Sequence, residues 1–243
     1  MDVSFATAAA PGRPNEDRVI AADDFVIVLD GVTSPPHVPT GCVHDPVWLV
    51  RTLGATLAAA LTRHPAHPLT DLLAHAIGEL RAAHSDTCDL SHPESPSSTV
   101  AIVRERGDEV DYLVLCDSTV VLAGPGGIRA ITDGRTSGLR GRTRASVAAL
   151  RNAPGGFWVA STEPAAAAEA LTGSVPRSAL DAVLVCTDGA TRLVELFGRD
   201  WSEALTLAGQ GRLLEAVRAA ELAHPPAGVK PHDDATVALC RFP

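Results

Sequence analysis

The sequence predicts an α+β fold, in which antiparallel strands and helices occupy separate stretches of the chain. Two helical patterns lie together between residues 45 and 84, and closely spaced β-branched runs follow between residues 97 and 132. Only short turn sequences separate those runs, which is typical of antiparallel strands and not of alternating strand–helix units. Two further apolar runs, FVIVLDG and VLVCTDG, indicate buried strands that each end in Asp-Gly.

The first third of the chain contains two predicted strands and two predicted helices. Residues 2–8 are expected to form a strand, and residues 24–29 a short buried strand rich in β-branched side chains. Residues 45–63 and 68–84 repeat apolar side chains at helical spacing, which predicts two amphipathic helices. Thr70 is the expected N-cap of the second helix.

The remaining elements follow from changes in that periodicity. An antiparallel meander is predicted from four strands, at residues 97–106, 110–117, 118–124 and 128–132. Beyond it we expect a loop with a short helix at 138–152, a strand at 156–161, a short helix at 163–171, a buried strand at 182–187, helix over most of 193–222 with a break near Gly209 and Gly211, and a last strand at 235–242.

Composition limits the functional class. The chain has 243 residues, which is long enough for one large domain, and we predict a single domain over residues 1–243. A net charge of −9 and an aromatic content of 4% argue against nucleic-acid binding, which needs cationic grooves and stacking surfaces. The N-terminus does not resemble a signal peptide, and no apolar stretch has the roughly 20 residues of a membrane span. No feature of the sequence indicates an oligomeric state.

The five cysteines are odd in number and irregularly spaced. A disulfide framework is therefore not expected, and a reducing cytoplasmic location is predicted. The nine histidines raise the possibility of a zinc site, but no Cys/His spacing matches a known structural zinc pattern, and most are interpreted as surface residues.

Acidic residues recur where predicted buried strands begin or end. Asp30, Asp117 and Asp188 each follow an apolar run, and Asp233-Asp234 precedes the last one. Turn chemistry accounts for a single Asp-Gly, but carboxylates gathered at several strand ends would repel one another. A divalent cation removes that repulsion because hard cations bind carboxylate and carbonyl oxygens. The pattern therefore predicts a metal site.

The order of these motifs resembles the PP2C (PPM) family of metal-dependent serine/threonine phosphatases. The motifs are R-x-N-E-D from Arg13, strand-DG at Asp30, SSTVA, CDSTVVL, strand-TDG at Asp188, and DDATV at Asp233. The resemblance extends from Arg13 to Cys240. It implies a four-layer α-β-β-α sandwich of two antiparallel sheets flanked by helices, and hydrolysis of phosphoserine and phosphothreonine in proteins.

The resemblance also implies a role for each matching residue. Asp30 would bridge two Mn²⁺ or Mg²⁺ ions, the Gly31 carbonyl would bind one of them, and Asp188 and Asp233 would complete the binuclear centre. Asp117 would contribute to a third, weaker metal position. Glu16 and Asp17 match the acidic pair that supports metal-bound waters, and Arg13 would hold the substrate phosphate. The two ions would activate a bridging water for in-line attack on phosphorus, so Arg13, Asp30 and Asp188 are the expected catalytic residues.

Several positions depart from the family pattern. Arg13 lies one position closer to the acidic pair than usual, and Val32-Thr33-Ser34-Pro35-Pro36 follows Gly31 where a histidine or methionine is common. Arg192 stands where some members have a further metal-site acid, and Cys116 replaces a glycine. These departures indicate a divergent branch with a modified substrate surface or reduced activity.

Other interpretations compete with this one. The stretch Cys186–Arg192 matches C-x5-R, the pattern of cysteine-dependent phosphatases, although Asp188 would place a carboxylate inside an anion-binding loop. A second interpretation is a phosphatase-like regulatory or binding protein, and a third is a small-molecule phosphatase on the same metal centre. The arginines 135, 140, 142 and 144 form either a solvated loop or a clamp for an acidic or phosphorylated substrate.

Overall fold

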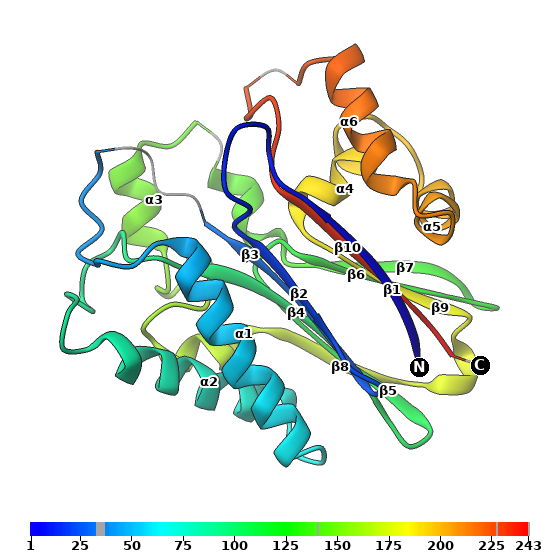
Figure 1. Cartoon of the computed structure of the whole chain (residues 1–243), viewed down its shortest axis with the longest axis horizontal. Helices are drawn as coiled ribbons and strands as arrows, with labels where there is room; N and C mark the ends of the chain where they lie inside the picture. Colours follow the sequence, from blue (N-terminus) through cyan, green and yellow to red (C-terminus); the bar gives the residue numbers. More distant parts are fainter. Residues whose placement is uncertain (33–36, 140, 227, 243) are drawn as a thin grey trace.

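The computed structural model of the protein describes residues 1–243 except 33–36, 140, 227 and 243. Its strands are β1 (Asp2–Ala8), β2 (Asp17–Ala21), β3 (Phe25–Gly31), β4 (Ser98–Arg106), β5 (Glu109–Leu115), β6 (Thr119–Gly124), β7 (Gly127–Thr132), β8 (Leu171–Pro176), β9 (Ala182–Cys186) and β10 (Ala235–Arg241). They form two antiparallel sheets (Figure 1). The first sheet has the order β1-β10-β9-β6-β7, and the second has the order β2-β3-β4-β5-β8.

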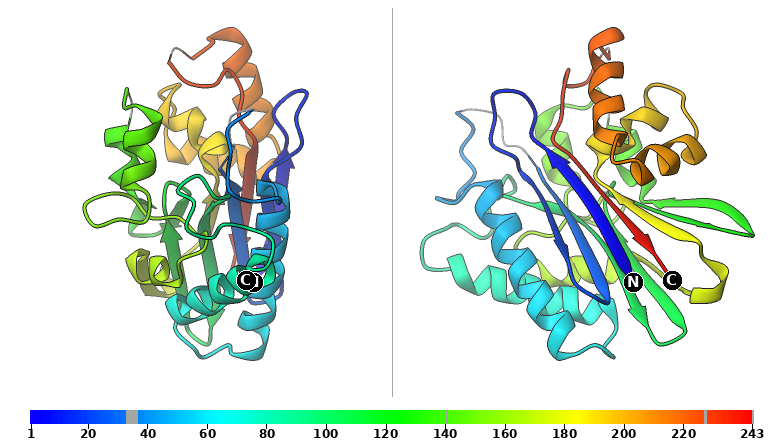
Figure 2. Two further views of the ribbon diagram at one scale, coloured as in Figure 1. Left: turned by 90° about the vertical axis from the view of Figure 1, so that its left-hand side faces the viewer. Right: turned by 45° about the vertical axis from the view of Figure 1, so that its right-hand side comes forward.

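Helices cover the outer face of each sheet. They are α1 (Pro46–Arg63), α2 (Leu69–His84), α3 (Arg144–Leu150), α4 (Asp188–Glu195), α5 (Trp201–Gly209) and α6 (Leu213–Ala223), with short 3-10 helices η1 (Gly134–Leu139), η2 (Pro164–Glu169) and η3 (Arg177–Ala179). Helices α1 and α2 pack on the second sheet, whereas α4, α5 and α6 pack on the first (Figures 1 and 2). The predicted α-β-β-α sandwich is confirmed.

Strand β3 explains why its sequence is a continuous apolar run. Side chains alternate across a strand, so Phe25, Ile27 and Leu29 join the core formed with α1 and α2. Val26 and Val28 point the other way, into the core between the two sheets. Both faces of the strand are therefore buried, and no alternation of apolar and polar residues is possible.

Several predicted elements differ in detail. Strands β2 and β8 were not predicted, because their short sequences mix exposed polar and apolar residues. The stretch 156–161 makes only isolated bridges, and 163–171 contains the 3-10 helix η2. Helix α2 begins directly after Pro68, so Thr70 lies within its first turn and is not the N-cap. The long C-terminal helical stretch begins earlier than expected, at Asp188, and is divided into α4, α5 and α6.

The predicted meander is wrong in one respect that matters for function, because its strands belong to two different sheets. Strands β4 and β5 pair in the second sheet, whereas β6 and β7 pair in the first. The chain crosses between the sheets at Cys116, whose φ of +68° turns the backbone sharply. A hydrogen bond of 2.6 Å between the Thr99 and Ser118 hydroxyl groups links the two sheets beside this crossing. The crossing brings Asp117 to the edge of the sandwich where β3 and β9 also end.

The two ends of the described chain lie side by side. Strands β1 and β10 pair along their whole lengths, with Asp2 opposite Arg241 (Figure 2). No helix in the described part of the chain is long and apolar enough to cross a membrane. The assignment of residues 1–243 to a single domain stays a prediction.

Candidate metal centre

Asp17 and Asp30 lie side by side because β2 and β3 pair in a register that places them opposite each other. Asp17 is 6% exposed, and its Oδ2 accepts a hydrogen bond of 2.9 Å from the Thr187 hydroxyl. Its Oδ1 is buried and has no hydrogen-bond partner among the described residues. Because buried carboxylate oxygens normally have partners, this oxygen marks a position where a ligand is expected.

Asp188 reaches the same edge from the first sheet. It follows β9 and is the first residue of α4, so its carboxylate lies at the positive end of the helix dipole. The next residue, Gly189, has to be glycine because a Cβ at this position would collide with the backbone carbonyl of Asp234. The second Asp-Gly pair therefore allows α4 to start in close contact with the chain that leads into β10.

Gly31 has a similar steric reason at the end of β3. A Cβ at Gly31 would lie 2.7 Å from the carbonyl oxygen of Glu16, and the Gly31 amide donates to that oxygen at 3.0 Å. The segment that joins β1 to β2 is thus held against the strand end. In both Asp-Gly pairs the glycine permits a close backbone approach, and the aspartate is left at the edge of the sandwich.

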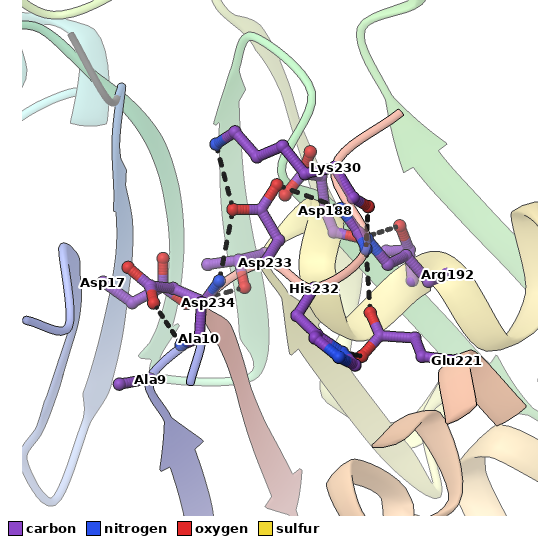
Figure 3. A network of polar contacts seen from close by, with 12 residues as sticks. Ala9, Ala10, Asp17, Asp188, Arg192, Glu221, Lys230, His232, Asp233 and Asp234 are labelled. Atoms are coloured by element: carbon purple, nitrogen blue, oxygen red, sulfur yellow. Dashed lines mark hydrogen bonds and ion pairs between the residues drawn. The ribbon is translucent and has the colours of Figure 1, made fainter. Parts of the chain in front are cut away.

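Asp233 and Asp234 are neighbours with different contacts. Asp234 accepts hydrogen bonds from the backbone amides of Ala10 at 2.6 Å and Glu16 at 2.7 Å, so it anchors the segment between β1 and β2. Asp233 pairs instead with two cations, Arg192 at 3.1 Å and Lys230 at 3.1 Å (Figure 3). Asp233 is therefore the strand-end acid whose charge is partly neutralised within the chain.

Burial and mutual repulsion raise the pKa values of the clustered carboxyl groups. Burial is the main cause at Asp17 and Asp188, whose pKa values are raised from 3.8 to about 7. The pKa of Asp30 is raised well above its ordinary value, first by burial and then by the charges of Asp188, Asp17, Asp117 and Asp233. The pKa of Asp117 is raised mainly by burial, with a contribution from Asp133. The positively charged side chains around the cluster therefore do not neutralise all of its carboxylates.

These residues fit a divalent cation. Carboxylates from β2, β3, the β5–β6 crossing, α4 and the start of β10 meet at one edge, and they raise one another's pKa values. Most remain partly exposed, so solvent and ligands can reach them. The unpartnered Asp17 oxygen is a further feature that an oxygen-seeking cation would satisfy.

The raised pKa values predict how the stability of the metal-free protein depends on pH. A group whose pKa is raised on folding stabilises the protein fully at pH values below its pKa in the unfolded chain. This stabilisation is lost as the pH rises through the pKa that the group has in the folded protein. For Asp17 and Asp188 that window runs from 3.8 to about 7. In chelator, the thermal midpoint should therefore fall between pH 5 and pH 7.5, and it should fall less in Asp188→Asn. A midpoint that rises over this range would contradict the prediction.

A family model decides where the chain belongs. The model for protein phosphatase 2C matches residues 6–217. The chain belongs to the protein phosphatase 2C family. The resemblance predicted from the motif order is confirmed.

Solved structures of bacterial phosphatases share the fold. A variant of a bacterial serine phosphatase is 13% identical with a TM-score of 0.68, and the alignment covers 100% of this chain and 99% of the other. The Mycobacterium tuberculosis serine/threonine phosphatase PstP/Ppp is 16% identical with a TM-score of 0.64, covering 99% and 98%. Stp1 from Staphylococcus aureus is 12% identical with a TM-score of 0.64, covering 100% and 95%. A comparison with curated proteins gives no significant match.

Two arginines that depart from the pattern of protein phosphatase 2C occupy contrasting environments. Arg13 is 45% exposed at its side chain and makes a long ion pair of 3.8 Å with Glu16. Arg192 is buried, and its guanidinium pairs with Glu221 at 2.8 Å as well as with Asp233. At Arg192 this chain therefore places a cation in contact with a cluster carboxylate. The replaced loop Thr33–Pro36 lies outside the described residues.

The environment of Cys186 does not suit a nucleophile. Its side chain is fully buried in the core between the first sheet and its helices. Burial raises the pKa of the Cys186 thiol far above its ordinary value, so the reactive thiolate is disfavoured. The interpretation of Cys186 as a core residue of a protein phosphatase 2C strand is therefore supported over the C-x5-R interpretation.

The arginines of the 135–144 run already have partners. Arg135 pairs with Asp133 at 2.7 Å and with Glu169 at 3.1 Å. Arg144 pairs with Glu94 at 2.9 Å, and the Arg142 side chain donates to the Gly138 carbonyl. Arg140 lies outside the described residues. These contacts favour a structural role for Arg135 and Arg144, because a phosphate clamp would need their donors free.

Some residues around the site were not predicted from the sequence. They are Thr187, which donates to Asp17, and the group Glu221, Lys230 and His232 that surrounds Arg192 and Asp233 (Figure 3). Glu221 lies on α6 and is enclosed there by Arg192, Arg218 and His232. A glutamate in an amphipathic helix normally faces solvent, so no local signal in the sequence indicates its burial.

Proposed function

We propose that this protein phosphatase 2C domain hydrolyses phosphomonoesters and acts on phosphoserine and phosphothreonine in proteins. The observation that carries the proposal is the meeting of Asp17, Asp30, Asp117, Asp188 and Asp233 from both sheets at one edge, with raised pKa values at the first four. The general dependence of the family on Mn²⁺ or Mg²⁺ supports a metal at this edge.

We assign the residues as follows. Asp30, Asp188 and Asp233, with the Gly31 carbonyl, would hold two ions, and Asp117 would help to hold a third. When bound, such ions would lower the pKa of a bound water and polarise a phosphoryl oxygen. Asp17, fixed by Thr187, would orient a water through its free Oδ1, together with Glu16.

Arg13 and Arg192 would perform different tasks at this centre. Arg13 is exposed beside Glu16, so its guanidinium can turn to bind two phosphate oxygens at once. Arg192 is held by Glu221 and by the Lys230 carbonyl, so it stays beside Asp233 and limits the negative charge that this carboxylate presents. We infer that Arg192 positions Asp233 and does not contact substrate.

The proposed function is tested by hydrolysis of p-nitrophenyl phosphate with Mn²⁺, with Mg²⁺ and with excess chelator. Activity should require the metal and should survive alkylation of the thiols, because the proposed chemistry uses no cysteine. Full activity in chelator together with loss on alkylation would support Cys186 chemistry instead. Phosphopeptides and phosphorylated metabolites should then be compared by kcat/KM, and a preference for metabolites would favour the small-molecule alternative.

Replacement of Arg13 tests phosphate binding. Arg13→Ala should raise KM and weaken inhibition by inorganic phosphate, with little change in Mn²⁺ affinity. One charge-assisted contact of about 1.5–3 kcal/mol predicts a loss in kcat/KM on the order of ten- to a hundred-fold. Arg13→Lys should recover only part of this loss, since an ammonium group cannot form the two-pronged contact. Unchanged kinetics in Arg13→Ala would mean that another residue binds the phosphate.

A regulatory protein with weak or no activity is the second candidate. The ion pairs of Asp233 with Arg192 and Lys230 favour it, because cations within the chain compete with a metal for this carboxylate. On this alternative, titration calorimetry would detect Mn²⁺ binding at the aspartates without measurable turnover. Turnover that rises and saturates in step with Mn²⁺ binding would exclude it.

A further inference from the structure

A second group of metal-binding side chains lies outside the aspartate cluster. The Cys42 Sγ lies 2.7 Å from the Cys88 Sγ and 3.6 Å from the His84 Nδ1. The three donor atoms all lie within 4.8 Å of one another. Neither cysteine forms a disulfide. Cys42 precedes His84 by 42 positions and Cys88 by 46 positions in the chain. The spacing of these three residues matches no familiar zinc pattern, so the group was not predictable from the sequence.

Local structure directs all three side chains toward one point. His84 is the last residue of α2, and the Cys88 amide donates to the His84 carbonyl at 3.1 Å, which continues the helical turn. Residues four apart in such a turn lie on the same side. Cys42 approaches from the segment before α1, and its sulfur accepts a hydrogen bond from the His44 amide at 3.4 Å. Amide donors of this kind stabilise a sulfur that carries negative charge.

His84 gives an independent indication that a ligand belongs here. The residue is only 2% exposed, and within the described chain its Nε2 has no hydrogen-bond partner. Its Nδ1 faces the Cys42 sulfur, which is a weak hydrogen-bond partner. An imidazole buried with so little polar compensation is costly. Coordination of a cation by the Nδ1 would replace this weak sulfur contact with a strong bond, and the Nε2 would then carry the ring proton.

The donor set selects the type of cation. Thiolate and imidazole suit zinc, whereas Mg²⁺ and Mn²⁺ prefer carboxylate and carbonyl oxygens. Zinc–sulfur and zinc–nitrogen bonds of about 2.3 and 2.0 Å place these atoms roughly 3.5 Å apart at a tetrahedral ion, close to the Cys42–His84 separation. The two sulfurs would have to move apart by about 1 Å, to roughly 3.7 Å.

A fourth ligand is available nearby. His44 is two residues after Cys42, and its ring centre lies 6.1 Å from that of His84. Its ring now stacks on Trp48 at 3.8 Å, so ligation by His44 requires the ring to leave this stack and turn a nitrogen toward the sulfurs. We propose that Cys42, His84 and Cys88 bind one zinc ion, with His44 as the fourth ligand, at a structural site separate from the aspartates.

The position of this site suggests what the ion would do. Cys42 lies in the segment that follows β3, and Cys88 lies in the segment that leads into β4. These strands pair at the aspartate edge, where Gly31 is opposite Ser98. The same two segments touch again where the Asp89 amide donates to the Gly41 carbonyl at 2.7 Å. Zinc would join the two segments by coordinate bonds in addition to this hydrogen bond, and would stiffen the border of the candidate metal centre.

Cobalt spectroscopy of the full, reduced chain tests the proposal. The experiment uses the Asp188→Asn background, which should weaken cobalt binding at the aspartates, so that the visible bands report the cysteine site. Absorption from thiolate-to-cobalt charge transfer requires cysteine ligands and is specific to that site. One equivalent of Co²⁺ should produce this absorption together with the visible bands of a tetrahedral ion, and Zn²⁺ should displace it. Cys42→Ser and Cys88→Ser should each lower zinc affinity by more than the roughly 10–100-fold that loss of an outer-shell partner costs.

Control variants separate the ligands from bystanders. His75→Gln on the exposed face of α2 and Cys240→Ala in the core should keep the full cobalt spectrum. His84→Gln should lose it, and His44→Ala should change the visible bands. An unchanged spectrum in His44→Ala would overturn His44 as the fourth ligand.

A measurement without substitutions guards against variants that fail to fold. In the unmodified chain, Zn²⁺ should protect Cys42 and Cys88 from alkylation, as read by mass spectrometry. The proposal is overturned if reduced protein shows neither a thiolate–cobalt band nor protection. It is also overturned if protein isolated anaerobically with zinc contains a Cys42–Cys88 disulfide, which would assign the pair to redox chemistry. Because p-nitrophenyl phosphate hydrolysis does not enter this assay, its outcome is independent of the proposed activity.

Discussion

Asp30→Asn should reduce phosphomonoester hydrolysis by roughly 10³-fold or more while leaving the fold intact. Asp30 is the carboxyl group on which the charges of Asp188, Asp17, Asp117 and Asp233 all act, so it lies at the electrostatic centre of the cluster. An amide cannot replace a bridging carboxylate, because it carries no charge and offers a single oxygen. Asp188→Asn should have a comparable effect on turnover. The turnover of both variants is measured with p-nitrophenyl phosphate at saturating Mn²⁺.

The same substitution should have the opposite effect on stability in chelator. Removal of one charge relieves repulsion among the remaining carboxylates, and a gain of about 0.5–2 kcal/mol in the free energy of unfolding is expected. Manganese should stabilise Asp30→Asn less than the unmodified protein. Asp24→Asn is the matched control, since Asp24 is exposed at the other end of β3 and should change neither quantity. Near-normal turnover in both Asp30→Asn and Asp188→Asn would mean that the metal centre lies elsewhere.

The largest effect on folding is expected at Arg192. Its side chain is 6% exposed, and its partner Glu221 is fully buried. Removal of one member of a buried ion pair typically costs about 3–5 kcal/mol because the other charge remains buried. Arg192→Met keeps the side-chain volume and should lower the free energy of unfolding by this amount, toward the lower end because Arg218 and His232 still contact Glu221. Urea unfolding in chelator measures it.

Metal binding provides the second measurement for Arg192. Asp233 would retain Lys230 but lose its closest guanidinium, so its carboxylate should attract a cation more strongly. Manganese should therefore raise the thermal midpoint of Arg192→Met more than that of the unmodified protein. Arg199→Met is the control, because Arg199 makes an exposed pair with Glu203 whose loss should cost less than about 1 kcal/mol. Equal responses to manganese would separate Arg192 from the metal centre and leave it a purely structural residue.

The two Asp-Gly pairs illustrate how far local sequence reasoning extends. A continuous apolar run predicts a strand buried on both faces, and the aspartate that follows marks its end. Both predictions agree with β3 and β9. The reason for each glycine was not predictable, because the colliding atoms belong to Glu16 and Asp234, which are distant from their glycines along the chain.

The cluster Cys42, His84 and Cys88 shows the limit of counting cysteines. The odd number and irregular spacing of the five cysteines predict only that no disulfide framework forms, and three of them are buried. The other two cysteines, Cys42 and Cys88, meet because the C-terminal end of α2 lies beside the segment that precedes α1. A helix pair of this kind brings together residues whose sequence separation depends on helix length, so no fixed spacing identifies them.

By itself, the sequence determined the periodicity of most elements, the acids at their ends and the family to which the chain belongs. These features depend on side-chain alternation, helical spacing and residue order, which are local properties. Tertiary structure alone decided that β4–β5 and β6–β7 lie in different sheets, so that Asp117 reaches Asp30 and Asp188. It also decided that Arg192 pairs with Glu221 and Asp233, 29 and 41 residues further along the chain. Such pairings depend on which surfaces pack together, because burial and charge neutralisation are properties of the assembled fold and no local pattern encodes them.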